Sequence, residues 1–293
     1  MEIRDVLPPD TIPSIDDPKF GASYFGNSTD CVIRLEGFPA RAYPICILHF
    51  HEIVNDVVVT PDGEEPVAVT WCPLCGSAIV YNRIVAGRTL SFGVSGKLAD
   101  DDLVMYDRET ESEWKQSTGE CIVGELIGVT LSLWPAAMMP WSRFDTEYEH
   151  GIVLQPPCGK SEAASATDEP EPIRCDESPY AAYFESEGFG LDAHRSKQSR
   201  RRWDRTDLDP KTVVLGIERD GDALAFPRPH VRDAGMLVEA TIGDTELCVV
   251  LVEPPVNSYP DRPGVVFSSP TVESPVVIEE RTCLQVPNPS KSP

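Results

Sequence analysis

The chain has 293 residues and a formal net charge of −23 at pH 7, with 48 acidic residues against 25 basic ones. A chain of this length buries a substantial core without disulfides or metals, and it suits one large domain or two closely packed ones. An acidic surface repels nucleic acid and anionic membranes, so we expect neither as a partner. Dense carboxylates predict a halophilic protein. A merely acidic mesophilic protein is the alternative, and a fold that is kept at low ionic strength would favour it.

The cysteines and the first residues bear on the compartment. The first twenty residues contain no apolar stretch fit for a signal peptide, and no later run approaches the roughly 18 apolar residues of a spanning helix. We therefore predict a soluble, cytoplasmic protein. The nine cysteines are an odd number, and in such a compartment they are expected to be thiols, core residues or ligands rather than a disulfide framework.

Short apolar runs separated by turn signals recur along the chain. They include "VIRLEG", "VAVTW", "SAIVY", "RTLSFGV", "DLVMYD", "CIVGEL" and "VTLSLW". This pattern is typical of a β-rich α+β fold with mainly antiparallel sheets or barrel-like halves, not of a βαβ series. Few helices are expected, and all are short: one near residues 44 to 50, one near 140 to 148, and one in "YAAYFES" after Pro179.

Composition divides the chain into four parts. Residues 1–157 form an N-terminal half with the His and Cys motifs, and residues 158–178, which are acidic and contain proline, are expected to be a linker or loop. Residues 179–254 form a scaffold-like C-terminal half, and residues 255–293 an extended, proline-rich tail. The basic "RSKQSRRRWDR" is either a solvated loop that balances nearby acids or a dock for a carboxylate surface.

A weak internal echo links the two halves. "VIRLEGFPARAYP" aligns without a gap with "LGIERDGDALAFP", so that Ala42-Tyr43-Pro44 corresponds to Ala225-Phe226-Pro227. The chain is then built from two weakly related halves, and the tripeptides occupy equivalent places. A chance similarity between two hairpins is the alternative.

The candidate functional site centres on a histidine and a cysteine pair. "VNDVVVT" and "PVAVTW" flank the turn signal "PDGEE", so they are expected to pair as a hairpin that brings His51 near Cys72. Cys72 and Cys75 have the spacing with which one tight turn grips a metal ion, and Gly76 gives the backbone freedom to wrap it. The predicted site therefore has His51, Cys72 and Cys75 as metal ligands.

Two other interpretations of the cysteine pair stay open. A redox dithiol normally opens a helix, whereas "GSAIVYNR" after Cys75 favours a strand. The two cysteines could also be buried structural thiols, and a lone His51 could be a core histidine. A missing ligand could be Asp107, the thioether of Met105, or an open position. Zinc is the default ion, and a thioether would favour copper.

Further polar residues could surround such a site. In "DLVMYDRETESEWKQ", two strands about a turn at residues 108 to 112 would place Met105 and Asp107 on one face, and Trp114 and Gln116 on one face of the returning strand. A cluster after His51 could orient its ring, or could cap a helix or form a turn. The predicted second shell or ligand pocket comprises Glu52, Asn55, Asp56, Ser95, Tyr106, Arg108, Trp114 and Gln116.

Several blocks resemble domain-of-unknown-function family 3179 of bacteria and archaea. They are "IPSIDDPKF", "ARAYPICILHFHEIVND", "VAVTWCPLCGSAIVYNR", "FGVSG", "DLVMYDRETESEWKQ" and "DPKTVVLGIE", in this order, within about residues 10–254. The resemblance implies motif roles for the candidate residues above and for Gly76 and Gly96, but it implies no settled activity. The chain departs from the family pattern at His49 and at "LADDD", residues 98 to 102.

We therefore expect a metal-dependent enzyme, oxidoreductase-like, that acts on a small molecule. The alternatives are a non-catalytic protein that binds, senses or delivers metal, and a thiol-disulfide redox protein. A cleft with perturbed titratable groups beside an open coordination position would favour the enzyme. The sequence specifies neither the substrate nor the oligomeric state.

Overall fold

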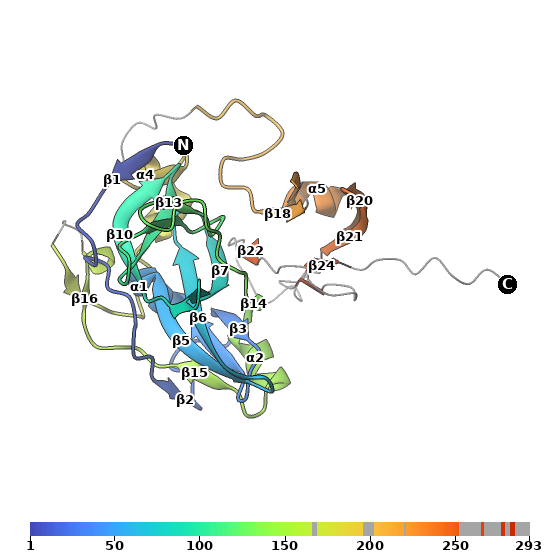
Figure 1. Ribbon diagram of the computed structural model, residues 1–293. Helices are drawn as coiled ribbons and strands as arrows, with labels where there is room; N and C mark the ends of the chain where they lie inside the picture. Colours follow the sequence, from blue (N-terminus) through green and yellow to red (C-terminus); the bar gives the residue numbers. More distant parts are fainter. Residues whose placement is uncertain are drawn as a thin grey trace.

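The computed structural model describes residues 1–165, 169–195, 202–219, 221–251, 265–266, 277–278 and 282–284. It is β-rich, with mostly antiparallel sheets and five short helices in these residues, as the sequence predicts (Figure 1). Among the described helices none is both long and apolar enough to cross a membrane.

The middle of the N-terminal half is a sheet in the order β22-β7-β6-β5. The predicted hairpin is confirmed, because β5 pairs with β6 from Ile53↔Thr70 to Thr60↔Gly63. From Val67 to Cys72 every residue of β6 is buried, so this strand is covered on both faces and its sequence is almost continuously apolar. The strands are β5 (Ile53–Thr60), β6 (Gly63–Cys72), β7 (Ser77–Asn82) and β22 (Val265–Val266).

A second sheet has the order β1-β10-β11-β12-β13. It shares one core with the middle sheet, in which Cys72 and Ile79 meet Leu103, Met105 and other apolar side chains. The two predicted strands about residues 108 to 112 are confirmed as β11 and β12, with Met105 opposite Trp114. The strands are β1 (Ile3–Asp5), β10 (Phe92–Ala99), β11 (Asp102–Asp107), β12 (Glu113–Lys115) and β13 (Cys121–Val123).

A third sheet has the order β14-β3-β4-β15-β2. Its side chains join Val69, Trp71 and Val80 of the middle sheet in another core, into which α1 packs Ile47 and Leu48. The middle sheet thus contributes alternate side chains of β6 to two different cores. The elements are β2 (Phe20–Gly21), β3 (Cys31–Leu35), β4 (Arg41–Pro44), α1 (Ile45–His51), β14 (Ala136–Pro140), α2 (Trp141–Glu147) and β15 (Ile152–Leu154).

The segment 158–178, expected to be a linker or loop, includes paired short strands and a 3₁₀ turn. The backbone N–H of Glu162 donates to the carbonyl of Thr11, so this segment is tied to the N-terminal half. Two short helices follow, the first of them at the predicted "YAAYFES". The elements are β16 (Lys160–Ser161), η1 (Glu162–Ala164), β17 (Glu171–Pro172), α3 (Ala181–Glu185) and α4 (Gly190–His194).

The internal echo corresponds to a repeated order of elements. The hairpin β3–β4 leads through α1 to the hairpin β5–β6, and the hairpin β18–β19 leads through α5 to the hairpin β20–β21. Pro44 and Pro227 each end a strand and begin a helix, with closely similar extended backbone angles. The second unit consists of β18 (Val214–Arg219), β19 (Asp222–Pro227), α5 (Arg228–Asp233), β20 (Leu237–Ile242) and β21 (Thr245–Leu251).

The second unit lies to one side of the N-terminal half (Figure 1). Its apolar residues, including Phe226 and Val249, belong to the same core as α1 and the third sheet. The remaining short strands are β8 (Ile84–Val85), β9 (Arg88–Thr89), β23 (Val277–Ile278) and β24 (Thr282–Leu284). Most of the predicted tail and residues 196–201 of the basic segment lie outside the described residues.

Candidate functional site

The cysteine pair lies in the tight turn that joins β6 to β7. The next element is a strand, as expected, and no helix begins at the pair. Gly76 has a φ of 62°, a left-handed conformation that glycine adopts without cost. Cys72 is buried and Cys75 is exposed. Cys75 is exposed as a residue, but its thiol is turned inward toward Asp102 at the start of β11.

Asp102 supplies a third potential ligand. The ligand atoms of Cys72, Cys75 and Asp102 all lie within 4.8 Å of one another. Two ligands of one tetrahedral zinc ion lie about 3.8 Å apart when each is about 2.3 Å from the ion, so the observed grouping suits a single ion. Asp102 begins β11, directly after the turn at Asp100 and Asp101, whose φ values are 56° and 68°. These left-handed residues form the tight hairpin turn that brings Asp102 to the cysteines.

Hydrogen bonds fix the Asp102 carboxylate. Its Oδ2 accepts a hydrogen bond from the backbone N–H of Ser117 at 2.8 Å, and the Cys75 thiol donates to its Oδ1 at 3.5 Å. Burial raises the pKa of Asp102. The Cys72 thiol, burial and the Asp102 charge raise the pKa of Cys75 well above its ordinary value. Three acidic groups are thus crowded together, an arrangement that a bound cation would stabilise.

His51 contributes no atom to this group. Its Nδ1 makes a 2.7 Å hydrogen bond with the carbonyl of Pro13, which makes Nδ1 the donor, and its buried Nε2 has no partner. Burial lowers the pKa of the ring, so it is neutral near pH 7. The helix that carries His51 packs its apolar side chains into the core on one face of the middle sheet, whereas Cys72 belongs to the core on the other face.

Met105 and Asp107 are also outside the group of three. Met105 is fully buried among apolar side chains. Asp107 accepts hydrogen bonds from Thr110 and, at 2.9 Å, from the indole Nε1 of Trp114. The carboxylate therefore stabilises the turn between β11 and β12, which is a structural role.

Most of the predicted pocket residues form a polar framework. Asn55 donates to the carbonyl of Phe92 and accepts from its backbone N–H, and Gln116 donates to Thr70. Asp56 accepts hydrogen bonds from Arg41 and Tyr43. These contacts hold the sheets in register.

The rest of that predicted set lies on the second sheet. Ser95 donates to the carbonyl of Val104 at 2.5 Å, within the bulge of β10. Tyr106 and Arg108 contact Asp10 and hold the segment that precedes Pro13. These three residues, like Asn55, Asp56 and Gln116, hydrogen-bond within the protein.

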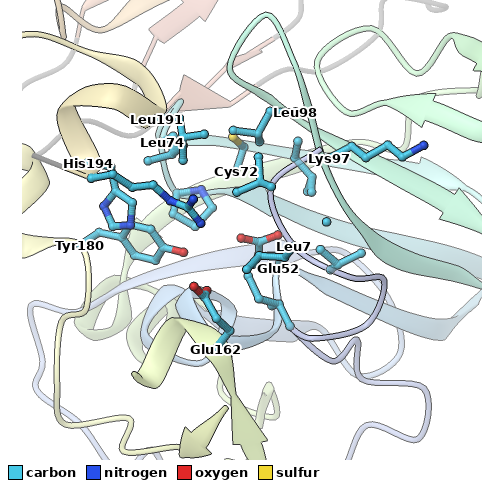
Figure 2. Close-up of a pocket in the computed structure, with 17 residues that line it drawn as sticks. Leu7, Glu52, Cys72, Leu74, Lys97, Leu98, Glu162, Tyr180, Leu191 and His194 are labelled. Carbon is cyan, nitrogen blue, oxygen red and sulfur yellow. The ribbon is translucent and has the colours of Figure 1, made fainter. Parts of the chain in front are cut away.

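A cavity of about 70 Å³ adjoins the group formed by Cys72, Cys75 and Asp102, and Cys72 is in its wall. The residues that line it come from the N-terminal segment, the end of α1, the cysteine turn, β10, η1 and α4 (Figure 2). Among them, Glu52 and Glu162 point toward the same space, with the Tyr180 hydroxyl close to both. The sequence predicted Glu52 as a site residue, but not Glu162 or Tyr180.

The electrostatics of the cavity are set by its carboxyls. Burial, together with the charge of Glu162, raises the pKa of Glu52 to about 8. Burial and the charge of Glu52 raise the pKa of Tyr180 well above its ordinary value, and burial lowers that of His194. Glu52 also has a φ of 57°, a strained conformation for a residue with a side chain. Perturbed groups of this kind, beside possible metal ligands, are typical of functional sites.

Two helices hold the cysteine turn from outside. The Tyr183 hydroxyl donates to the carbonyl of Leu74 at 3.0 Å, which ties α3 to the turn. Arg4 pairs with Asp192 of α4 at 2.8 Å and with Asp101 at 3.4 Å. The segment from 158 to 195 thus completes a site that begins in the N-terminal half.

The fold and the site together define a β-rich protein with a cluster of two cysteines and one aspartate beside a small cavity. A family model described as "Protein of unknown function (DUF3179)" matches residues 9–262, so the chain belongs to this family. Searches of curated proteins and of solved structures gave no match.

Proposed function

We propose that this protein is a zinc-dependent enzyme whose ion is held by Cys72, Cys75 and Asp102. The observation that carries the proposal is the convergence of their three ligand atoms within 4.8 Å. Thiolates and carboxylates are common zinc ligands, and Cys-x2-Cys is a common zinc-binding spacing. Asp102 takes the place that the sequence assigned to His51.

The donor set favours zinc over copper. A thioether would have been the reason to prefer copper, but Met105 is buried in an apolar core. A carboxylate is a hard oxygen ligand, and zinc accepts it together with soft sulfur. Zinc is therefore the ion that best suits these residues.

The number of protein ligands favours catalysis. Structural zinc sites usually have four protein ligands, whereas catalytic sites have three and keep one position for water or substrate. A zinc ion with such a position supplies a Lewis acid or a bound water of lowered pKa. Cys72 would join the ion to the cavity wall, where Glu52 can hold or release a proton near neutral pH.

The redox alternative has less support. A nucleophilic cysteine needs a lowered pKa, which a helix N-terminus or a nearby cation provides. The pKa of Cys75 is raised, and β7 follows the pair. Metal delivery is a second candidate, favoured by the exposure of Cys75, because an acceptor could reach a ligand at the surface. Fast transfer of zinc from the folded protein to a competing chelator would distinguish delivery from catalysis.

The first experiment is elemental analysis of protein purified without chelators or a metal-binding tag. We expect one zinc per chain, lost in Cys75→Ser and Asp102→Asn. Cys158→Ser is the matched control, since Cys158 is an exposed thiol outside the group. Most of the fold should persist in all three variants, because the core does not depend on one ion. Full zinc occupancy in Asp102→Asn, or no zinc in the wild type, would overturn the proposal.

A further inference from the structure

The cavity beside Cys72 has a polar end and an apolar body. Glu52, Glu162 and Tyr180 are at the polar end (Figure 2). The apolar wall includes leucines from the N-terminal segment, the cysteine turn, β10, β11 and α4, namely Leu7, Leu74, Leu98, Leu103 and Leu191. A wall of this kind selects a ligand with a hydrocarbon part.

Two buried polar groups face the cavity without protein partners. Glu52 and Tyr180 are only 7% and 6% exposed. Within the part of the chain that the structure describes, the Glu52 carboxyl and the Tyr180 hydroxyl have no hydrogen-bond partner, and both point into the cavity. Neither group is among the fully enclosed polar atoms that lack a partner. Both are therefore accessible from the cavity, and a ligand there could hydrogen-bond to both.

The charges around this polar end favour a cation. Glu162 is the charged group that acts on the Glu52 carboxyl. Lys97 also lines the cavity, but its ammonium is 2.7 Å from Glu113 and points away in Figure 2. Arg195 also lines the cavity, and its charge helps to lower the pKa of His194, but it is not among the groups that act on Glu52. The Tyr180 ring is stacked on His194 at 5.1 Å, which holds its hydroxyl at this end of the cavity.

We propose that this cavity binds a small primary ammonium ion with a short hydrocarbon chain. The ammonium group donates hydrogen bonds to a Glu52 carboxyl oxygen and to the Tyr180 hydroxyl oxygen, and the chain contacts the leucines. The positive charge of the ligand favours the ionised form of Glu52, so binding releases the proton of that carboxyl. The volume of about 70 Å³ limits the ligand to a few heavy atoms, because one water occupies about 30 Å³ in the liquid. The proposal does not require a metal ion, although a substrate bound here would lie beside Cys72.

The test is a titration with ethylammonium chloride, followed by protein NMR on the full chain. Ethanol and acetate are the neutral and anionic controls of similar size. We expect saturable binding of ethylammonium, about tenfold or more weaker binding of ethanol, and no binding of acetate. Glu52→Gln should weaken ethylammonium binding about tenfold, whereas Glu36→Gln, which removes an exposed carboxylate elsewhere, should not change it.

A second variant covers a failure of Glu52→Gln to fold. Tyr180→Phe keeps the ring but removes the hydroxyl, and it should weaken binding by several fold. The titrations are run on zinc-loaded and on chelator-treated protein. A failure of the zinc proposal can then be distinguished from a failure of ethylammonium to bind. Absence of saturable ethylammonium binding, equal binding of ethanol, or wild-type affinity in the folded variants would overturn the inference.

Discussion

The two hairpin–helix–hairpin units have the same order of elements but different surroundings. In the first unit, five of the seven residues of α1 are buried, and the unit ends in the cysteine turn. In the second unit, Val231 is the one buried residue of α5. The two units thus share an arrangement of elements and differ in the residues at the end of the helix and of the second hairpin. Glu52 and Cys72 occupy these two ends in the first unit.

Substitutions in the two equivalent tripeptides should differ most in their effect on the free energy of unfolding. Tyr43 is fully buried and donates to Asp56 at 2.5 Å, whereas Phe226 is 9% exposed and has no polar group. Tyr43→Ala should lower the free energy of unfolding by about 5 kcal/mol, because a cavity and a lost hydrogen bond add together. Phe226→Ala should cost about 3 kcal/mol. Urea unfolding of both variants measures this, and equal losses would mean that the two units are equally important to the core.

Substitutions in α1 and α5 should show the next largest difference in stability. Leu48 of α1 is fully buried and Val231 of α5 nearly so. Leu48→Ala should cost about 3 kcal/mol and Val231→Ala between about 1 and 2 kcal/mol, since the larger side chain leaves the larger cavity. Thermal unfolding compares them, with wild type as reference. A larger loss in Val231→Ala would contradict the view that α1 is the better anchored helix.

A smaller effect concerns the end of α1 and depends on pH. The pKa of Glu52 is about 8 in the folded protein and about 4.5 in the unfolded chain. The stabilisation from its bound proton is therefore complete below pH 4.5 and is lost as the pH rises to about 8. Between pH 6 and pH 8 the wild type should lose about 2 kcal/mol more stability than Glu52→Gln, which cannot ionise. Urea unfolding of both proteins measures this difference. If the free energies of unfolding of the wild type and Glu52→Gln depend on pH in the same way, Glu52 is not buried as described.

Local elements were predictable from the sequence, because their signals are local. The turn signal at residues 61 to 65 predicted the hairpin β5–β6, and Pro44 and Pro140 predicted the starts of α1 and α2. The strand after Cys75 was predicted from its β-branched and aromatic residues. These elements depend on neighbours in the chain, so the sequence contains the information directly.

The proposed third ligand and the cavity residues Glu162 and Tyr180 were not predictable in the same way. Asp102 reaches the cysteines because two sheets pack on one core, and residue spacing does not reveal that contact. The one signal was the aspartate run at residues 100 to 102, the first two of which form the tight turn. Glu162 and Tyr180 come from a segment whose composition suggested a linker and from the residues just after it, and their positions depend on long-range packing.

X-ray absorption at the zinc edge of the purified protein reports the identity of the zinc ligands. The account predicts two sulfur ligands at roughly 2.3 Å and oxygen ligands at roughly 2.0 to 2.2 Å, without the outer-shell scattering of an imidazole ring. In Asp102→Asn the zinc signal should be lost, as in the elemental analysis of that variant. An imidazole signature would place His51 on the ion, and a spectrum with fewer than two sulfurs would contradict a site built on Cys72 and Cys75.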